Sequence, residues 1–285
     1  APPTLAPFSV TTRGGPPPPL TVPASVDAVD GAQLRNAQMQ VNLSESMGSV
    51  PGLQIQNRQN YAQDQQLSIR GFGARSTFGV RGVRIYVDGV PSTMPDGQGQ
   101  TSNIDIGSAD RVEVLRGPFS ALYGNSSGGV LQVFTEDGEG PPRLGLGVAG
   151  GSFGSWRESL QLSGSNGPFS YLLSGSHFET DGYRDHSAAE RSIVNGKLGF
   201  ALQDDSKLTV VLNGVRIRAQ DPLGLTPAQY AQDRRSAALA EQFDTRKTVD
   251  QMQAGVIYER RLNADNGLRL IVHEGRKAPV VAVSV

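Results

Sequence analysis

The sequence predicts an α+β domain with a small mixed sheet, followed by antiparallel strands of the kind that form a transmembrane β-barrel. Glycine and proline are frequent, at 35 and 18 of 285 residues, and they are spread along the chain, which indicates many turns. After residue 139 the chain changes to segments of roughly ten residues that alternate apolar and polar side chains, as barrel strands do. No apolar run reaches the roughly 18 residues that a membrane-spanning helix needs.

The composition argues against several classes of function. The formal net charge is −1, so no overall field favours nucleic acid as a partner. Cysteine is absent, which excludes disulfides, thiolate metal sites and a cysteine nucleophile. The sequence shows no set of metal ligands, and we expect no bound metal and no cofactor. The first residues lack the basic and apolar regions of a signal peptide.

Composition and pattern divide the chain into four parts: 1–23, 24–138, 139–273 and 274–285. The first part is rich in proline, and we interpret it as an extended arm. Within this arm, residues 8–12 form a short β-prone piece.

A helix is predicted near the start of the second part. Asp30 is a suitable N-cap, and Gln33 stands where it would complete a capping box. Leu43, Met47 and Val50 follow at spacings of four and three, which places them on one face of a helix.

Five strands are predicted in the same part. Val83, Ile85 and Val87 alternate with polar residues and lead into Asp88-Gly89, a strong signal for a tight turn. The expected strands lie at 52–56, 66–71, 83–91, 110–117 and 128–137.

The third part is expected to supply about seven antiparallel strands of an incomplete barrel. Leu160 and Leu162, for example, alternate with polar neighbours. The connections alternate between short and long, the longest being 219–247, which is typical of barrels with short periplasmic turns. At Gly214 the apolar phase slips, which predicts a β-bulge. The alternative for this part is a soluble antiparallel sandwich, which the exposed edge strand disfavours.

Ser126 lies in a G-x-S-x-G pattern, the signature of a hydrolase nucleophile elbow. An elbow needs a strand before the serine and a helix after it, whereas a β-type run follows here. We therefore interpret residues 124–128 as a polar turn between two strands and keep a serine hydrolase as the distant alternative.

Several motifs in the second part stand in a fixed order: SVPGLQI, LSIRGFG, VRIYVDGVP and DRVEVLRGPFSALYGNSSGGVLQVFT. In this order they resemble the plug domain of TonB-dependent outer-membrane receptors. The resemblance covers about residues 20–138, and the alternating strands that follow look like the first part of the barrel. DGVPSTMPDGQGQ is most similar to receptors of the ferric-citrate and siderophore type.

The resemblance implies a fold and a mechanism. Such receptors are 22-stranded barrels whose lumen is closed by the plug. They sit in the outer membrane of Gram-negative bacteria, in contact with its lipid, and they are not enzymes. A ligand, most often a ferric siderophore or ferric citrate, binds at outer loops and plug apices. The inner-membrane protein TonB then pulls on an N-terminal segment called the TonB box, and the ligand enters the periplasm.

The TonB-box candidate is the β-prone piece of the arm. FSVTT resembles the family's box, which pairs with the edge of a TonB strand through backbone hydrogen bonds. The residues concerned are Phe8, Ser9, Val10, Thr11 and Thr12.

The resemblance also implies contacts inside the barrel. Arg70 and Arg116 match the arginines of the family's IRG and LRGP motifs, which resemble latches between plug and barrel wall, and we include Glu113 in this latch. Four glycines are expected at turns that need a positive φ or a close backbone approach: Gly71, Gly117, Gly124 and Gly129.

Three plug loops, near 57–65, 74–80 and 91–100, are expected to face outward toward the ligand. The polar residues expected to contact it are Arg75, Asp96, Gln98 and Gln100. An anionic ligand would favour Arg75.

Residues 274–285 depart from this pattern, because a Val/Ala run with Pro279 replaces the expected strand-and-turn sequence. We expect the chain to be truncated or to end in a frameshifted tail, and we do not expect seven strands to transport by themselves.

Two further alternatives stay open at the level of the sequence. A receptor of the same family could carry another cargo: cobalamin, a sugar or another metal chelate. A soluble β-rich binding module would explain the strands without a membrane.

Overall fold

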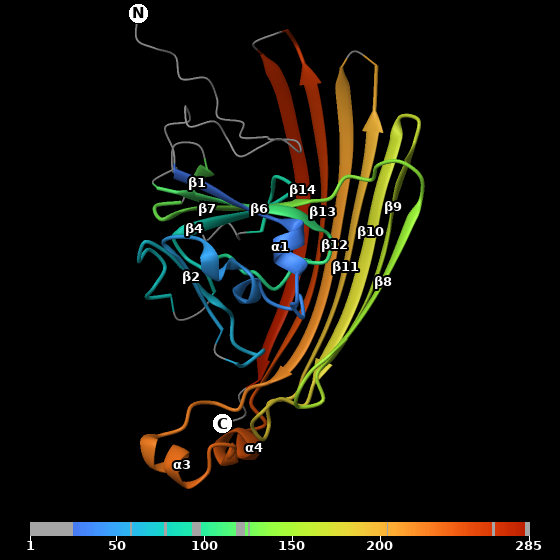
Figure 1. The fold of residues 1–285 in the computed structure, drawn as a ribbon. Helices are drawn as coiled ribbons and strands as arrows, with labels where there is room; N and C mark the ends of the chain where they lie inside the picture. The colour runs from blue at the N-terminus through green and yellow to red at the C-terminus, as the bar shows by residue number, and fades with distance from the viewer. Residues whose placement is uncertain are drawn as a thin grey trace, which may run out of the picture.

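The computed structural model describes residues 25–57, 59–76, 79–92, 98–117, 123–124, 126–203, 205–263 and 266–282. These residues form two parts, shown in Figure 1: a compact domain and a tall curved sheet that partly encloses it. We call the domain up to residue 138 the plug and the sheet from residue 143 the wall. The TonB-box candidate, residues 8–12, and Asp96 lie outside the described residues.

The plug is built on a five-stranded mixed sheet with the order β1-β6-β7-β4-β5. Strand β4 pairs with β7 in parallel, and the other pairs are antiparallel. The small mixed sheet predicted from the sequence is therefore confirmed. A separate antiparallel pair, β2 and β3, lies beside it. The strands are β1 (Ser25–Asp30), β2 (Leu53–Gln56), β3 (Gln66–Ile69), β4 (Val83–Val87), β5 (Val90–Pro91), β6 (Ala109–Arg116) and β7 (Gly129–Thr135).

The helix predicted after Asp30 is only partly correct. Asp30 does cap a helix, since its side chain accepts a hydrogen bond from the Gln33 backbone at 2.8 Å, but helix α1 spans only Gly31–Arg35. Ala37 and Gln40 then adopt left-handed backbone conformations, which end the helix.

Two 3-10 turns, Leu43–Glu45 and Met47–Ser49, replace the rest of the predicted helix. The Glu45 carboxylate accepts hydrogen bonds from the backbone amides of residues 40, 41 and 42, so these amides are bound by a side chain instead of by helical carbonyls. Leu43 and Met47 are still buried in the plug core, as their spacing suggested.

The tight turn predicted at Asp88-Gly89 is confirmed. Both residues have positive φ, 50° and 83°, as a type I′ hairpin turn requires, and Val87 pairs with Val90 across it. Asp88 also accepts two hydrogen bonds from Thr135, one from its backbone at 3.0 Å and one from its hydroxyl at 2.6 Å. The turn residue thus ties the β4–β5 hairpin to the end of β7.

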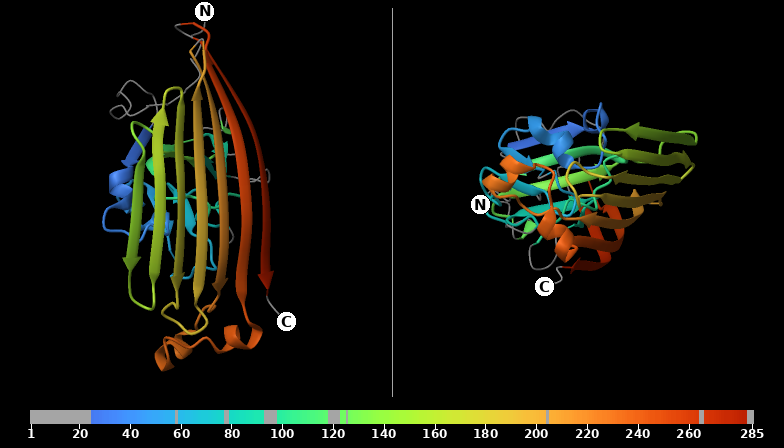
Figure 2. Two further views of the ribbon diagram at one scale, coloured as in Figure 1. Left: turned by 90° about the vertical axis from the view of Figure 1, so that its right-hand side faces the viewer. Right: turned by 90° about the horizontal axis from the view of Figure 1, so that it is seen from below.

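The wall is a seven-stranded antiparallel sheet in simple sequence order. This agrees with the prediction of about seven barrel strands, and among the described residues the sheet is open, with β8 and β14 at its edges. Figure 2 shows the strands side by side, with the plug against the concave face. The strands are β8 (Arg143–Gly150), β9 (Trp156–Asn166), β10 (Phe169–Thr180), β11 (Ala189–Ala201), β12 (Ser206–Gln220), β13 (Arg246–Arg261) and β14 (Gly267–Ala282).

The connections differ between the two ends of the wall. One end carries the short connections 167–168, 202–205 and 262–266. The other end carries longer loops, including 221–245 with helices α3 (Pro227–Gln232) and α4 (Ala238–Phe243). This long-loop end lies at the bottom of Figure 1. Among the described residues, no helix is both long and apolar enough to cross a membrane.

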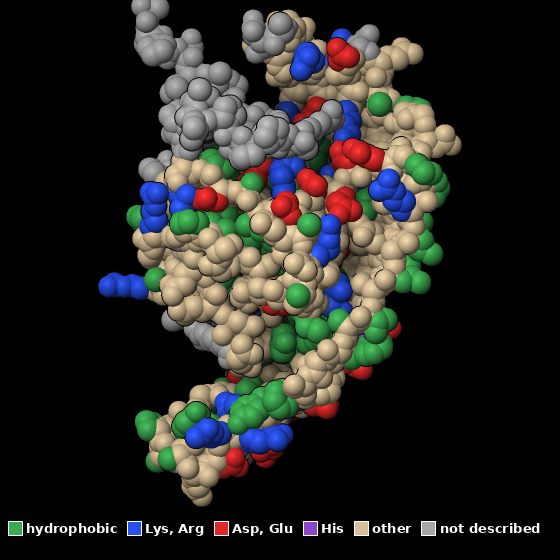
Figure 3. All heavy atoms as spheres, viewed as in Figure 1, with side chains coloured by type: hydrophobic (Ala, Val, Ile, Leu, Met, Phe, Trp, Pro, Cys, Tyr) green, Lys and Arg blue, Asp and Glu red, His purple; other side chains and the backbone are tan. Residues whose placement is uncertain are grey.

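The two faces of the wall have different chemistry. Adjacent Leu172 and Leu173 illustrate this: Leu172 is fully buried against the plug, whereas Leu173 points outward and is 47% exposed. Figure 3 shows hydrophobic side chains along the outer edge of the sheet, over β8 and β9. The large apolar side chains exposed on the wall include Leu144, Leu146, Val148, Leu160, Val194, Leu212, Met252 and Val256.

The bulge predicted at Gly214 is wrong, because β12 pairs with both neighbours through this position without a register shift. The apolar residues instead change face. Leu212 points outward, whereas Val215 and Ile217 point inward and are buried, and Arg216 takes the exposed outward position between them. From Val215 to the long-loop end, β12 therefore directs its apolar side chains toward the plug and its charged side chains outward.

The sequence also placed the end of the regular strands too early. Residues 274–282, expected to be an atypical tail, continue β14 and pair with β13 as far as Ala282. Two charged residues, Glu274 and Arg276, stand opposite Ala254 and Met252 of β13 and are exposed.

Candidate ligand pocket and plug–wall contacts

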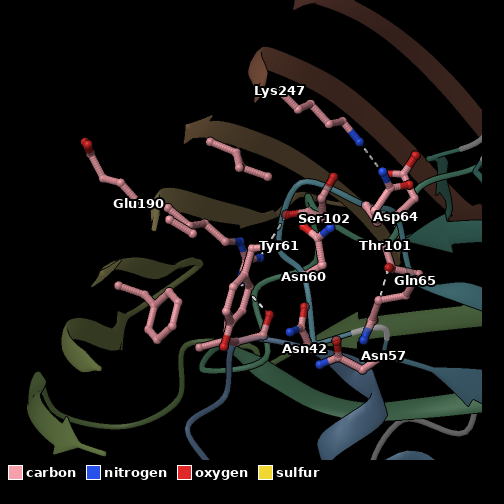
Figure 4. Close-up of a pocket in the computed structure, with 16 residues that line it drawn as sticks. Asn42, Asn57, Asn60, Tyr61, Asp64, Gln65, Thr101, Ser102, Glu190 and Lys247 are labelled. Atoms are coloured by element: carbon pink, nitrogen blue, oxygen red, sulfur yellow. Dashed lines mark hydrogen bonds and ion pairs between the residues drawn. The ribbon is translucent and has the colours of Figure 1, made fainter. Parts of the chain in front are cut away.

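A pocket lies between the plug and the long-loop half of the wall (Figure 4). It encloses about 650 Å³ of space that includes open solvent. Plug segments 41–42, 57–65 and 101–102 form one side, and β10 to β13 form the other. Of the three loops predicted to face the ligand, 57–65 thus supplies most of the plug side.

Side-chain amides dominate the plug side of this pocket. Each amide offers both hydrogen-bond donors and acceptors, so the lining can bind oxygen and nitrogen atoms of a ligand without fixing its charge. Gln65 is oriented by two neighbours, since it donates to Ser44 at 2.7 Å and accepts from Thr101 at 3.3 Å. The lining amides are Asn42, Asn57, Asn60, Gln63 and Gln65.

The loop 57–65 is fixed to the long-loop end of the wall by charged residues. Asn60 donates to the Asp221 carboxylate at 2.7 Å, and Gln63 donates to its other oxygen. Asp64 forms an ion pair with Lys247 of β13 at 2.6 Å, drawn as a dashed line in Figure 4. Asp221 is also paired with Thr245 through the backbone, so it stands at the base of the loop 221–245.

Tyr61 anchors the same loop to an apolar part of the wall. Its ring packs on Phe178 with a centroid distance of 5.1 Å. Burial, and to a lesser degree the charge of Glu45, raises the pKa of Tyr61 above its ordinary value, so the hydroxyl is neutral at physiological pH. The apolar cluster beneath it comprises Ala62, Ala189, Ile193, Val215, Ile217, Ala219 and Val249.

Arg191 of β11 reaches from the wall into the plug and lines the pocket. Its guanidinium donates to three plug carbonyls, those of Val41 at 2.7 Å, Ser102 at 2.8 Å and Ile104 at 2.9 Å. Its Nε is buried and has no hydrogen-bond partner among the described residues. A single wall side chain therefore joins two plug segments that are distant in sequence.

A second group of plug–wall contacts lies toward the short connections and consists of ion pairs. Lys197 of β11 binds Asp137 at 2.8 Å, Asp88 at 3.3 Å and the Thr135 carbonyl at 2.9 Å. Lys207 of β12 binds the other Asp137 oxygen at 3.3 Å. Burial acts to raise the pKa of Asp137, but the two lysines outweigh it and hold that pKa below its ordinary value. Figure 3 shows charged side chains gathered where plug and wall meet.

Sequence reasoning missed these wall residues. Arg191, Lys197, Lys207 and Lys247 look like ordinary polar positions of alternating strands, and their partners lie 60 to 183 residues away in the chain. The alternation of each strand could have indicated these residues, because a charged residue on the inward face of a barrel strand must meet the plug or the lumen.

The predicted latch residues have their observed partners inside the plug. Arg116 forms an ion pair with Asp27 and donates to the Pro51 carbonyl. Glu113 is buried and pairs with Arg111 at 2.8 Å. Arg70 is exposed, with a positive φ of 51°. A latch from these residues to the wall stays a prediction.

The four predicted turn glycines all have positive φ: Gly71 at 86°, Gly117 at 140°, Gly124 at 73° and Gly129 at 144°. At Gly129 a side chain would also collide with the Leu115 carbonyl of the neighbouring strand.

The predicted ligand-contacting residues that the structure describes do not line this pocket. Gln100 is buried and approaches Asp64 at 3.5 Å. Gln98 packs near Gly79, and Arg75 is exposed.

The surroundings of Ser126 are those of a turn. The side chain is buried, and its hydroxyl donates to the Gly124 carbonyl at 3.2 Å. Strand β7 follows, where a nucleophile elbow has a helix.

Comparison with known proteins gives a consistent result. A family model described as "TonB-dependent Receptor Plug Domain" matches residues 18–130. The pesticin receptor of Yersinia enterocolitica is 35% identical over 117 residues, which cover 40% of this chain and 16% of that protein. The ferric yersiniabactin uptake receptor FyuA from Yersinia pestis has a similar fold, with a TM-score of 0.72 at 20% identity over 92% of this chain and 42% of that chain. The unliganded ferric citrate transporter FecA matches with a TM-score of 0.71 at 18% identity over 91% of this chain and 40% of that chain.

The fold is that of a plug domain packed against the wall of a β-barrel. Residues 18–130 match the plug-domain family of TonB-dependent receptors, and the described residues share the fold of solved receptors of that type. The chain spans less than half the length of the solved receptors that it matches. The segment matched by the pesticin receptor covers 16% of that protein.

Proposed function

We propose that the protein is an outer-membrane receptor for the TonB-dependent uptake of a metal chelate, in the first place a ferric siderophore or ferric citrate. The observation that carries the proposal is the amide-lined pocket between plug and wall at the long-loop end. A chelate presents carboxylate, hydroxyl or amide oxygens at its surface, and side-chain amides bind all of these. Binding and passage require no covalent step.

The outward face of the wall supports the proposed position in the outer membrane. On β12 the outward apolar stretch from Leu208 to Gly214 spans about 20 Å along the strand, close to the roughly 25 Å apolar band of outer-membrane barrels. Phe169, Phe200 and Tyr258 stand in neighbouring registers at the short-connection end, where an aromatic girdle belongs. The short connections then face the periplasm, and the pocket faces the outside.

The proposed contact with TonB rests on the N-terminal arm. Strand β1 is the first described strand and lies at the edge of the plug sheet, where it pairs with β6 alone. The arm that precedes β1 therefore joins the plug at an edge strand. We assign Phe8–Thr12 as the segment that adds a strand to TonB, because its sequence FSVTT resembles the family's box and strand addition relies on backbone hydrogen bonds. Force applied there reaches the plug through β1 and β6.

The test is chelate binding to the purified protein, measured by calorimetry with ferric citrate and with a ferric hydroxamate as probes. Replacing Gln63→Ala removes a pocket amide that also positions the loop, and we expect about tenfold weaker binding of the preferred probe. Gln203→Ala makes the same chemical change at an exposed short connection and should leave the affinity unchanged. Equal affinity in both variants would place the ligand elsewhere.

The same calorimetry experiment also identifies the cargo of the receptor. Saturable binding of cobalamin or an oligosaccharide, without binding of either iron chelate, would support the alternative cargo and reject the iron assignment.

A further inference from the structure

A second cavity lies directly beneath the pocket, between the plug and strands β8 to β10. It comprises about 510 Å³ of space, part of which is open to solvent. Its lining includes Gln40, Asp105 and Arg157, whereas the pocket above is lined by Val41 and Ser102. The two spaces therefore share two neighbouring plug segments, 40–42 and 102–105, as their common boundary. We call these two segments the septum.

The septum is held from both sides by charged groups. From the plug, the Glu45 carboxylate accepts hydrogen bonds from the amides of residues 40, 41 and 42, at 2.8, 2.9 and 2.6 Å. From the wall, Arg191 donates to one carbonyl of the first segment and two of the second. Hydrogen bonds to a charged group are about twice as strong as neutral ones, so these contacts fix the septum more firmly than loop packing would.

The wall beside the lower cavity includes two glycines of β8. Gly145 and Gly147 of β8 line it, and at Gly145 an added side chain would meet only ordinary van der Waals contacts. Asp105 at the septum's lower side is bound by Ser174 of β10, and Arg157 donates to Ser159. The plug side of the cavity thus carries charged and polar groups that can bind a hydrated or oxygen-rich solute.

We propose that the pocket and the lower cavity are consecutive compartments of one passage, and that Arg191 is the wall residue that holds the septum between them closed. The inference rests on the proposed uptake function and adds the route and its barrier. Arg191 is a positioning residue: it acts through the plug segments 40–42 and 102–105 and need not touch the cargo. Opening requires the three carbonyls to leave its guanidinium, which removes the one side chain that ties the two segments to each other. The bonds from Glu45 to the first segment and from Asn213 and Ser174 to the second must then give way as well.

The absence of cysteine allows a direct test in cells that produce the protein. Asn57→Cys reports on the upper pocket, and Ser159→Cys reports on the lower cavity. A charged, membrane-impermeant methanethiosulfonate is added from outside, and the labelling rate of each single cysteine is measured with and without Arg191→Gln. The control is Arg216→Gln, the same change on the exposed outer face of β12.

We expect Asn57→Cys to be labelled quickly in every background, and Ser159→Cys to be labelled slowly unless Arg191 is replaced. Arg191→Gln should accelerate labelling of Ser159→Cys by about tenfold or more, because local opening controls the access of the reagent. Arg216→Gln should change neither rate. Hydrogen exchange of peptides covering residues 40–42 and 102–105 should accelerate in the Arg191 variant alone.

Fast labelling of Ser159→Cys in the unaltered background would overturn the proposal, as would unchanged labelling in Arg191→Gln. If Arg191→Gln does not reach the membrane, Glu45→Ala releases the first septum segment from the plug side and is judged by the same criteria. Labelling requires no cargo, so a failure of the iron assignment leaves this result intact.

Discussion

The two ends of the plug–wall interface are held by different chemistry. Near the pocket, the plug is held mainly by side-chain amides, backbone carbonyls and the carboxylate of Asp221, together with the ion pair of Asp64 and Lys247. Near the short connections, Lys197 and Lys207 bind Asp88 and Asp137 in one ion-pair network. Hydrogen bonds to loops can be exchanged for bonds to a ligand, whereas separating buried charges is costly. The comparison indicates a plug that is adaptable on the ligand side and anchored on the opposite side.

The largest expected effect is the loss of the anchor at Lys197. Lys197→Met leaves the Asp88 carboxylate buried without its cation, and removing one partner of a buried pair costs about 3 kcal/mol or more. Denaturant unfolding of the protein in detergent should show this loss. The matched change Lys247→Met, near the pocket, should cost less, since its partner Asp64 has Gln100 beside it. Equal losses of unfolding free energy in the two variants would contradict the difference between the two ends of the interface.

A smaller effect is expected at the base of the outer loop. Asp221→Ala removes the acceptor for Asn60 and Gln63 and should destabilise the loop 57–65 by about 1–3 kcal/mol. Hydrogen exchange in this loop measures the effect, while exchange in β7 should stay unchanged. If β7 loosens as well, the two ends of the interface are not independent.

The tight turn at the anchor should be moderately sensitive. Gly89→Ala places a side chain at a φ of 83° and should cost about 1 kcal/mol. Gly145→Ala on β8 is the control, because its added methyl group has room. Similar unfolding midpoints for the two variants would contradict the turn geometry.

The smallest expected effect is a dependence on pH at Asp137. Its pKa is lower in the folded protein than in the unfolded chain, so its contribution to stability is present above the unfolded value of about 3.9 and is lost as the pH falls through the folded value. Asp137→Asn should therefore lower the free energy of unfolding at neutral pH and flatten its decline in acid. Parallel pH profiles of the two proteins would exclude this linkage.

Local sequence signals predicted local structure well. The Asp88-Gly89 turn and the alternating wall strands follow from two or a few neighbouring residues, which is why they could be recognised. The helix after Asp30 was overestimated because Glu45 binds the amides of residues 40–42, a contact that helical spacing does not reveal.

The site was harder to predict because it depends on pairs that are distant in the chain. The loop 57–65 is predicted to face the ligand through resemblance, but its partners Asp221 and Lys247 come from wall strands and loops far along the sequence. Arg191 shows the same limit. Its role follows from three carbonyls in two plug segments, and a carbonyl carries no sequence signal at all.

The central claim, energised uptake of a metal chelate, is tested most directly by radioactive iron uptake in cells that produce the protein as their only receptor for the supplied chelate. We expect uptake from a ferric siderophore or ferric citrate, its loss in cells without TonB, and the same loss in Val10→Pro, which removes a backbone donor from the proposed TonB box. Uptake that persists without TonB, or iron uptake that this protein does not change for any chelate, would contradict the account.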